Sequence, residues 1–450
     1  MTVISNHMPT AELQALDAAH HMHPFTTQDD LAKQGARVIT RADGVWIHDS
    51  EGNQIIDGMA GLWCVNVGYG RDRLAEVAAR QMKELPYYNT FFMTTHVPAI
   101  ALSQKLAELA PGNLNHVFYA GSGSEANDTN IRMVRTYWAQ KGKPSKKVII
   151  SRKNAYHGSS VGSASLGGMT GMHAQGGLPI ADIHHIDQPN YWAEGGEVSR
   201  EEFGLERARQ LEQAIHDIGE DNVAAFIAEP IQGAGGVIVP PETYWPEIKR
   251  ICDKYEILLI ADEVICGFGR TGKMFGCETM GIEPDIMVMS KQLSSSYMPI
   301  SAVMMNDQVY QPVADESDKI GTFGHGYTGS GHPVGAAVAL ENIKIIEERD
   351  LVGNAAKLSP LFIERLTALT GNPLVKEMRG IGLIGALELK QQGDAVGVAG
   401  AAMSAACMER GLIVRNLGDT VALCPPLIIT EAQLNELFDI YADALASLSF

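Results

Sequence analysis

The sequence predicts an α/β fold, in which a large domain with a mostly parallel central sheet is joined to a smaller α+β domain. Three observations predict it. The chain of 450 residues is longer than one small core requires. Its middle part alternates short apolar runs with amphipathic helical patterns, and its last part mixes helical patterns with fewer strand-like runs. We place an N-terminal segment at 1–75, the large domain at 76–330 and the smaller domain at 331–450. The N-terminal segment is expected to supply an arm and part of the smaller domain.

The central sheet is predicted from apolar runs that lack polar alternation, which is typical of strands buried on both faces. Helical patterns with apolar residues at i, i+3, i+4 and i+7 lie between these runs. The predicted strands of the large domain are residues 147–151, 223–228, 257–261, 286–289 and 300–305. In the rest of the chain, helices are expected at 334–349, 355–369 and 398–410, and strands at 45–49, 54–57, 380–389 and 411–415.

Composition excludes several classes of protein. Hydrophobic residues make up 45% and charged residues 20%, which is ordinary for a globular protein. The net charge of −18 disfavours nucleic acid as a partner, because phosphate binding needs clustered Lys and Arg. No apolar run approaches the ~18 residues of a membrane helix, and residues 1–19 lack a secretory pattern. We therefore expect a cytoplasmic protein with neither a membrane nor a nucleic-acid partner.

The potential metal ligands are few. Six cysteines are scattered without a C-x-x-C pair, which argues against a zinc site or a disulfide framework and fits a reducing compartment. His20, His21 and His23 lie close together in the N-terminal arm. We find no acidic residue or cysteine at a supporting spacing, so we expect a surface arm and no metal.

Two glycine-rich stretches compete as phosphate-binding motifs. Residues 267–273 match G-x-G-x-x-G and partly resemble the nucleotide P-loop. However, Met274 stands where a P-loop needs Ser or Thr, and no amphipathic helix follows to hold a phosphate. We expect a structural loop there, and not an ATP or dinucleotide site.

The second stretch, residues 121–127, follows an apolar run and precedes a helical pattern. Ser122 and Glu125 have the spacing of a capping box. Glycine lets the backbone approach an anion closely, and the free amides and dipole of a helix N-terminus then stabilise it. The stretch therefore predicts an anion cradle at Gly123 and Ser124.

Three polar residues directly follow predicted strands. Glu229, Asp262 and Lys291 come after the runs 223–228, 257–261 and 286–290. In an open parallel sheet, the carboxyl ends of the strands form the binding crevice, so the two acids and the amine are expected to meet there. A buried lysine paired with Asp262 for structural reasons alone is the alternative.

A lysine in such a crevice has a specific chemistry. Desolvation depresses the pKa of its ammonium group, and the neutral amine forms an imine with an aldehyde. Pyridoxal 5′-phosphate (PLP) supplies an aldehyde and an electron sink. Asp262 suits its ring nitrogen, the cradle suits its phosphate, and Tyr156 and Val264 can cover the two faces of its ring.

The ordered motifs of the chain resemble the class III aminotransferases, which have the PLP-dependent transferase fold type I. The markers cover nearly the whole chain, and two further segments, 61–70 and 411–415, look like those of the amine:pyruvate or ω-aminotransferases, putrescine–pyruvate enzymes in particular. The markers are residues 121–127, 156–158, 229–233, 262–264, 267–272, Lys291 and 331–333.

The resemblance implies roles for individual residues. Lys291 is expected to carry the cofactor as a Schiff base and to act as catalytic base and acid, with Asp262 as its catalytic partner. It also implies a homodimer with shared active sites, although the sequence does not distinguish a dimer from a tetramer. The expected cofactor-binding residues are Gly123, Ser124, Tyr156, His157, Glu229, Asp262, Val264 and Lys291, with Thr328 from the neighbouring subunit. The expected substrate-binding residues are Trp63, Tyr156, Ala234 and Arg415, with Phe91 from the partner and Arg415 holding the carboxylate of a keto acid.

The implied activity is transfer of an amino group from a primary amine or ω-amino acid to a keto acid, pyruvate, by a ping-pong mechanism. An aminomutase or epimerase of the same fold is the alternative. A PLP-binding regulator would carry a DNA-binding domain, of which the acidic chain shows no sign. The sequence does not identify the amine donor.

Three departures from the family pattern concern the pocket. Ornithine- and GABA-type relatives carry Glu where this chain has Ala234, so Arg415 is expected to swing out when an uncharged group binds. They carry Gln where this chain has Ile265, so the cofactor hydroxyl needs another partner. Gly329 and the run 291–296 also differ from the commoner versions, which affects the shape of the pocket.

Overall fold

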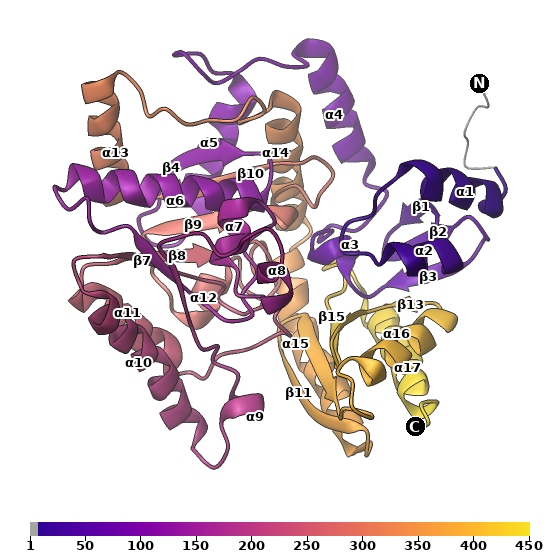
Figure 1. Cartoon of the computed structure of the whole chain (residues 1–450). Helices are drawn as coiled ribbons and strands as arrows, with labels where there is room; N and C mark the ends of the chain where they lie inside the picture. The colour runs from indigo at the N-terminus through magenta and orange to yellow at the C-terminus, as the bar shows by residue number, and fades with distance from the viewer. Residues whose placement is uncertain (1–7) are drawn as a thin grey trace.

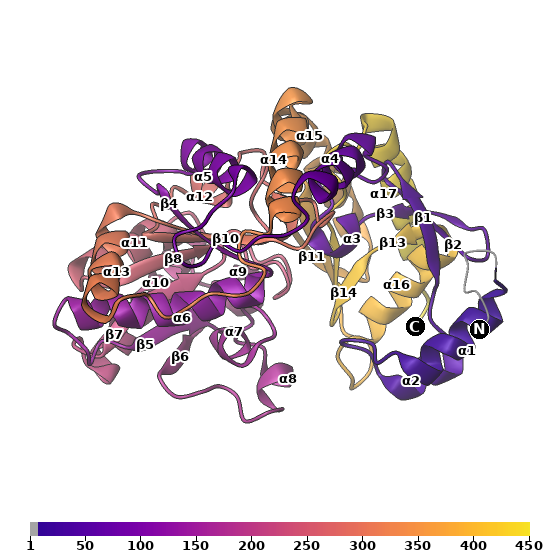
Figure 2. The same cartoon turned by 90° about the horizontal axis from the view of Figure 1, so that it is seen from above.

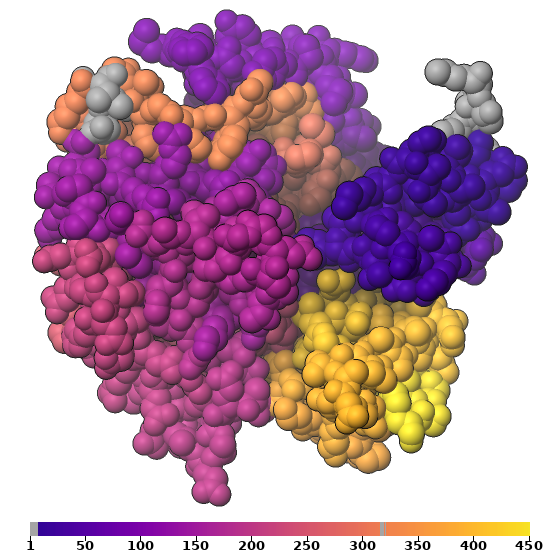
Figure 3. Space-filling view, viewed as in Figure 1, coloured from indigo at the N-terminus to yellow at the C-terminus, as the bar shows by residue number. Residues whose placement is uncertain are grey.

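The computed structural model describes residues 8–450, with the side chains of all of them except 316–318 and 320. Residues 1–7 of the predicted N-terminal arm lie outside the described residues. The chain forms a large part around one seven-stranded sheet and a smaller part around two four-stranded sheets (Figure 1). In the space-filling view the two parts lie side by side, and the N-terminal and C-terminal segments are together in the smaller part (Figure 3).

The seven-stranded sheet is mostly parallel, as predicted. Strands β9, β8, β7, β5 and β6 pair in parallel, whereas β10 is antiparallel to both of its neighbours. The runs 223–228 and 286–289 are strands over the predicted residues. The strand predicted at 300–305 begins one residue later, and those predicted at 147–151 and 257–261 are each shifted by one residue toward the C-terminus. In spatial order the strands are β4 (His116–Ala120), β10 (Ser301–Met305), β9 (Ile286–Met289), β8 (Leu258–Asp262), β7 (Val223–Ala228), β5 (Val148–Arg152) and β6 (Ile183–Ile186).

Helices cover both faces of this sheet, because successive strand side chains point to opposite faces. Phe226, Leu259 and Met287 belong to one buried cluster, and their neighbours Ile260 and Val288 belong to another. Figure 2 shows α6 and α7 on one side of the sheet, with α5 and α14 on the other. The helices around the sheet are α4 (Asp72–Glu84), α5 (Val97–Leu109), α6 (Gly123–Gln140), α7 (Val161–Leu166), α8 (Thr170–His173), α9 (Tyr191–Glu194), α10 (Arg200–Ile218), α11 (Tyr244–Lys254), α12 (Gly276–Met280), α13 (Asp307–Ile320) and α14 (Pro333–Glu348).

The smaller part combines both ends of the chain. Strand β13 (Leu412–Ile413) pairs in parallel with β3 (Gln54–Asp57), which joins the C-terminal segment to the N-terminal sheet. The other elements are β1 (Ile39–Asp43), β2 (Trp46–Asp49), β11 (Val375–Ile381), β12 (Ile384–Leu389), β14 (Arg415–Leu417), β15 (Thr420–Leu423), α1 (Thr10–His20), α2 (Gln28–Gln34), α3 (Ala60–Trp63), α15 (Leu351–Ala368), α16 (Val398–Glu409) and α17 (Glu431–Ala446).

Two predicted strands of the smaller part are wrong. Residues 380–389 were expected to form a single strand, but they turn back on themselves, so that β11 pairs antiparallel with β12. The turn falls at Gly382, whose φ is +61°, a conformation that glycine adopts without steric cost. The predicted run includes only the last two residues of β11, because the earlier part of β11 carries the charged Lys376, Glu377 and Arg379 and does not look like an apolar strand. Residues 411–415 divide between β13 and β14, which belong to different sheets.

The glycine-rich loop that contains Arg270 has a structural role. The Arg270 side chain is fully buried and donates hydrogen bonds to the carbonyls of Leu383 (3.0 Å) and Pro425 (2.6 Å) and to Oδ1 of Asn66 (2.7 Å). The five-residue α12 that follows is far shorter than the helix of a nucleotide site. This loop therefore ties the large part to both ends of the chain.

Two expectations from the sequence concern membrane-spanning helices and disulfide bonds. Among residues 8–450, no helix is both long and apolar enough to cross a membrane. All six cysteines are buried and free, so none forms a disulfide.

Candidate active site

The carboxyl ends of three adjacent parallel strands carry the predicted polar residues. Asp262 is the last residue of β8, Glu229 follows β7, and Lys291 begins a short 3₁₀ turn after β9. Because β7, β8 and β9 are neighbours in one sheet, the three side chains lie at one edge. Both acids act electrostatically on the pKa of Lys291, which places them in its surroundings.

The carboxylate of Asp262 is buried and held in a fixed orientation. Its Oδ2 accepts a hydrogen bond from Nδ2 of Asn127 at 2.9 Å and lies 2.7 Å from Nδ1 of His157. Its Oδ1 accepts from the amide of Val264 at 3.1 Å. The side chain of Asp262 is 3% exposed and that of His157 is fully buried. These bonds fix the orientation of the carboxylate at the crevice.

Lys291 has an unusual backbone and an unusual pKa. Its φ of +38° lies in the left-handed region, which costs a residue with a Cβ free energy of order 1–3 kcal/mol. Burial lowers the pKa of its amine from the usual 10.5, and the nearby Cys64, Asp262 and Glu229 oppose that shift. A larger share of the amine is therefore neutral near pH 7 than in an exposed lysine.

The predicted anion cradle is the N-terminus of the 18-residue α6. Ser122 caps it, because its Oγ accepts from the amide of Glu125 at 3.2 Å. The amides of Gly123 and Ser124 lie in the first turn, where a helix offers them no acceptor. A Cβ on Gly123 would lie 3.7 Å from Ser290, the residue before Lys291, so the cradle borders the lysine.

The capping-box prediction is half correct. Glu125 does bond back across the helix start, but its carboxylate accepts from the amide of Gly121 at 2.6 Å instead of from the cap residue. A second glycine closes the cradle. Gly158 has a φ of +136°, and a Cβ there would lie 2.6 Å from Oγ of Ser124. Only glycine fits this close approach.

Glu229 orders the segments beside Asp262. Its carboxylate accepts from the amide of Tyr156 at 3.2 Å and from that of Gly233 at 3.0 Å. Burial raises the pKa of Glu229. Tyr156 and Val264 are both half-buried, so each retains a face toward the crevice.

The Trp63 segment forms the wall next to Lys291. Asp57 holds its turn, accepting from the amides of Met59 (3.0 Å) and Gly61 (2.5 Å) and from the hydroxyl of Tyr69 (2.6 Å). Trp63 is 3% exposed and has a φ of +63°. Burial raises the pKa of the Asp57 carboxyl.

Ala234 and Arg415 differ in their surroundings. Ala234 is half-buried in a loop that Arg379 fixes by donating from Nε to the carbonyl of Gly236 at 2.6 Å. Arg415 is exposed on β14, opposite Ala422 of β15. Among residues 8–450, no hydrogen bond or ion pair is found for the Arg415 side chain, so its guanidinium is free to meet a ligand.

Phe91 and Thr328 belong to one surface region. The hydroxyl of Tyr87 donates to the carbonyl of Thr328 at 2.8 Å, and a Cβ on Gly326 would lie 2.7 Å from the Phe91 ring. Thr328 is exposed. Several large apolar side chains close to Phe91 in the sequence are also exposed, namely Tyr88, Phe92, Met93, Val97 and Ile100. An exposed apolar patch of this kind is typical of a protein–protein interface.

Two positions that depart from the family pattern, Ile265 and Gly329, differ in burial. Ile265 is buried against Gly233, where a Cβ would lie 2.5 Å from its Cδ1, so it forms an apolar wall below the crevice. Gly329 is exposed, and nothing would contact a Cβ there within 4 Å. The departure at Gly329 therefore opens the surface beside Thr328.

The prediction about the N-terminal histidines was wrong in one respect. Asp17 does have a supporting spacing, because it lies one helical turn before His21. Its carboxylate contacts Nδ1 of His21 at 3.0 Å and Nε2 of His23 at 2.7 Å, and in the part of the chain that the structure describes this is the one such group close enough for a metal ion. Hydrogen bonding alone accounts for the arrangement.

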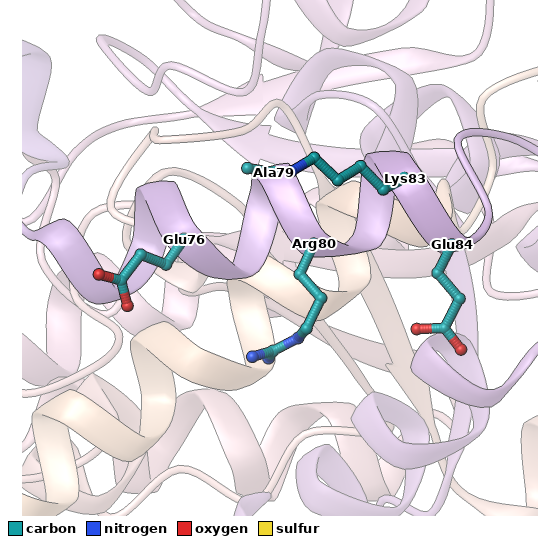
Figure 4. Close-up of a pocket in the computed structure, with 5 residues that line it drawn as sticks. All are labelled: Glu76, Ala79, Arg80, Lys83 and Glu84. Atoms are coloured by element: carbon teal, nitrogen blue, oxygen red, sulfur yellow. The ribbon is translucent and has the colours of Figure 1, made fainter.

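Two surface hollows have none of these site residues in their lining. One, of about 540 Å³, runs along a single face of α4, from which its lining side chains project (Figure 4). The other, of about 440 Å³, lies between the N-terminal sheet and the end of α16. The first is lined by Glu76, Ala79, Arg80, Lys83 and Glu84, and the second by charged and amide side chains including Arg37, Glu51, Asn53 and Arg410.

Sequence reasoning missed several residues of the site. Asn127 was noted only as part of a motif, although it bonds Asp262 directly. Gln292 and Asp57 were not singled out, since neither stands in a pattern that indicates a contact across the chain. For Gln292 the available signal was its position directly after Lys291. For Asp57 it was its position at the end of a strand.

The residues gathered here fit PLP. An amine with a lowered pKa, a fixed carboxylate, a helix N-terminus closed by Gly158 and partly exposed faces of Tyr156 and Val264 are the groups that this cofactor requires. Together with the sheet topology, they define a PLP-dependent enzyme of fold type I.

Comparisons with known proteins identify the family. A family model described as aminotransferase class-III matches residues 28–445, so the chain belongs to the class-III aminotransferases and is a PLP-dependent aminotransferase. It is 53% identical over 434 residues to a putrescine–pyruvate aminotransferase of Pseudomonas aeruginosa, which covers 95% of this chain and 94% of that one. The predicted family, fold, enzyme class and cofactor are thereby confirmed.

Solved structures agree with this assignment. An omega transaminase from Pseudomonas jessenii in complex with PMP has a TM-score of 0.95 at 46% identity, over 96% of this chain and 97% of that one. A thermostable omega transaminase variant, engineered for asymmetric synthesis of enantiopure bulky amines, has a TM-score of 0.95 at 46% identity over 96% and 98% of the two chains. The engineered protein carries substitutions of a tryptophan, a phenylalanine and an arginine.

Proposed function

We propose that this aminotransferase moves the amino group of a primary amine, with putrescine as the first donor to test, to pyruvate in two half-reactions. The observation that carries the proposal is the Lys291 amine, with its lowered pKa, beside the fixed Asp262 carboxylate at one sheet edge. The 53% identity to a putrescine–pyruvate aminotransferase supports the choice of donor and acceptor.

Several residues would hold the cofactor. The amides of Gly123 and Ser124 would bind the phosphate, and Asp262, oriented by His157, would face the ring nitrogen. Tyr156 and Val264 would cover the ring, and Glu229 would fix Tyr156 through its amide. When bound, PLP supplies an aldehyde that takes up the amino group and an electron sink that stabilises charge on the donor carbon.

Lys291 would perform the proton transfers. Because burial lowers its pKa, the amine is able to accept a proton from the donor carbon at neutral pH and return it in the second half-reaction. The Asp262 carboxylate would stay directed at the ring nitrogen throughout, since Asn127 and the amide of Val264 both donate to it.

The substrate end would discriminate by shape and charge. Trp63 and Ala234 would form the pocket walls, and the free Arg415 guanidinium would bind the pyruvate carboxylate through two parallel hydrogen bonds. With Ala234 in place of an acidic residue, Arg415 has no partner from that loop and would turn outward when an amine binds. The engineered transaminase supports this assignment, because its substituted Trp, Phe and Arg occur in the same chain order as Trp63, Phe91 and Arg415.

The active unit would be a homodimer with shared sites. The exposure of Thr328 and the apolar surface next to Phe91 support this proposal, since both residues lie where a second copy can cover them. Six unpaired cysteines support a reducing compartment, and we infer the cytoplasm.

Mixing two inactive variants tests the shared site. Lys291→Ala and Thr328→Asp chains, refolded together, would form mixed dimers with one wild-type site, so activity should return to about a quarter of the wild-type value for random pairing. No recovery, with mixed dimers verified by mass, would contradict the assignment of Thr328 to the neighbouring site.

A donor screen tests the reaction itself. The holoenzyme is incubated with pyruvate and putrescine, β-alanine, taurine or an aromatic amine, and alanine formation is followed. We expect alanine with putrescine at the highest kcat/KM. Turnover of an amine without any keto acid would instead indicate an aminomutase or epimerase.

A further inference from the structure

Gln292, the residue after Lys291, joins three segments of the site. Its side chain is fully buried, and its Nε2 donates to the carbonyl of Trp63 and to that of Ile265, each at 2.8 Å. Trp63 belongs to the proposed pocket wall, and Ile265 lies three residues after Asp262. One side-chain amide therefore connects the lysine, the substrate wall and the strand end that carries the ring-facing carboxylate.

Further bonds make the connection a continuous seam. The amide of Val67 donates to Oγ of Ser295 at 3.3 Å. The hydroxyl of Tyr297 donates to the carbonyl of Gly68 at 2.8 Å and accepts from the amide of Arg71 at 3.1 Å. Segment 63–71 is thus bound to segment 291–297 along its length, and Gln292 is the point of the seam nearest to the lysine.

The seam holds strained backbone on both sides. Lys291, Ser295 and Ser296 have positive φ angles of +38°, +47° and +58° on one side, and Ala60 and Trp63 have +48° and +63° on the other. Residues with a Cβ keep such angles only where their surroundings determine the conformation. Loss of the Gln292 bonds should therefore release both segments.

The opposite side of the Lys291 turn is fixed independently. Asn342 of α14 donates from Nδ2 to the carbonyls of Gln292 (2.8 Å) and Leu293 (3.1 Å). The turn is therefore clamped between a helix behind it and the Trp63 segment in front. Within the turn Lys291–Leu293, Gln292 is the side chain for which the described structure shows a hydrogen bond to the Trp63 segment.

We propose that Gln292 is a positioning residue that couples the Trp63 wall to Lys291, so that seating of the amine and placement of the lysine amine depend on each other. The inference rests on the proposed function for its kinetic readout only. Through this coupling, a shift of the Trp63 backbone would move the Lys291 turn, and a direct contact between the Trp63 and Lys291 side chains is not required.

The test compares Gln292→Leu with the matched control Asn354→Leu. Leucine has a similar size but cannot donate, so in the first variant the carbonyls of Trp63 and Ile265 lose their partner. Asn354 makes the same kind of bridge, from Nδ2 to the carbonyls of Leu427 (2.7 Å) and Ile429 (3.0 Å), in the smaller part of the molecule.

Three readouts separate positioning from general stability. In Gln292→Leu we expect amide hydrogen exchange of 60–71 and 291–297 in the cofactor-free protein to rise at least about tenfold. We also expect the pH midpoint of the visible absorption of the bound cofactor to shift, and kcat for the amine half-reaction to fall about tenfold with a higher KM. Asn354→Leu should leave all three unchanged.

Each outcome decides the proposal. An unchanged absorption midpoint and unchanged exchange of 60–71 in Gln292→Leu would overturn it. If Gln292→Leu does not fold, Gln292→Asn, which keeps the amide on a shorter side chain, should show the same changes to a smaller degree, and wild-type behaviour in all readouts would overturn the proposal. Failure of the proposed function appears differently, because the wild-type enzyme would then also fail to form alanine while exchange and absorption still report on Gln292.

Discussion

The two ends of the crevice are built differently. At the cofactor end, Asp262 is nearly inaccessible and accepts bonds from Asn127 and from the amide of Val264, with His157 alongside. At the substrate end, Arg415 is exposed without a bonded partner among the described residues. One end is held by hydrogen bonds within this chain, whereas the other presents an exposed cation. Changes at the first should therefore abolish the chemistry, and changes at the second should alter the choice of substrate.

The largest effect is expected at Lys291. Replacing it by alanine removes the group that accepts and returns the proton, so alanine formation from pyruvate should fall by about 10⁴-fold. Circular dichroism serves as the control for folding. Retention of a tenth of the wild-type turnover would show that the proton transfer lies elsewhere.

Asp262→Asn should weaken the reaction less than loss of the lysine. The variant keeps the size of the side chain but removes the charge that faces the ring nitrogen, and turnover should fall by about 10²–10³-fold, or about 3–4 kcal/mol. Steady-state kinetics at saturating cofactor measure this. The matched control is Asp285→Asn, a half-buried carboxylate at the opposite end of the sheet that accepts from the amide of Leu259.

Arg415→Ala tests the substrate end. Loss of a charge-assisted pair worth about 1.5–3 kcal/mol should raise the KM for pyruvate about 10–100-fold and leave the KM for an uncharged amine donor within about threefold. Arg415→Lys should lie between, because it keeps the charge but not the paired geometry. An equal rise for both substrates would place Arg415 outside the carboxylate site.

The smallest effect concerns stability. The pKa of Lys291 is lowered in the fold, so the protonated amine is disfavoured there. The cofactor-free protein is therefore destabilised as the pH falls below the usual 10.5, and most strongly below the folded pKa. Lys291→Met should therefore unfold at a higher urea concentration than the wild type at pH 7. The difference should shrink as the pH rises toward the usual value of 10.5. A constant difference at all pH values would show that packing, and not charge, is responsible.

The same contrast explains what the sequence could predict. Asp262, Lys291 and Gly123 follow apolar runs whose ends are visible in the sequence, and parallel pairing then brings them together. The β11–β12 hairpin was missed because β11 carries Lys376, Glu377 and Arg379 and lacks the apolar run that indicates a strand. The bridge made by Gln292 was also missed, since it depends on a contact across 229 positions of the chain.

The N-terminal arm teaches a similar lesson. The spacing of Asp17 and His21 is helical, but the contact with His23 depends on how the chain turns after α1. Local periodicity predicts the first contact and says nothing of the second. The exposed region around Phe91 and Thr328 is a further case, because its proposed burial would depend on a second chain.

Chemical trapping of the cofactor tests the central claim most directly. The holoenzyme is reduced with borohydride, digested and mapped by mass spectrometry, so that the lysine bonded to the cofactor is identified. The account predicts a pyridoxyl group on Lys291 and on no other lysine. A pyridoxyl group on a different lysine of the native enzyme would contradict it.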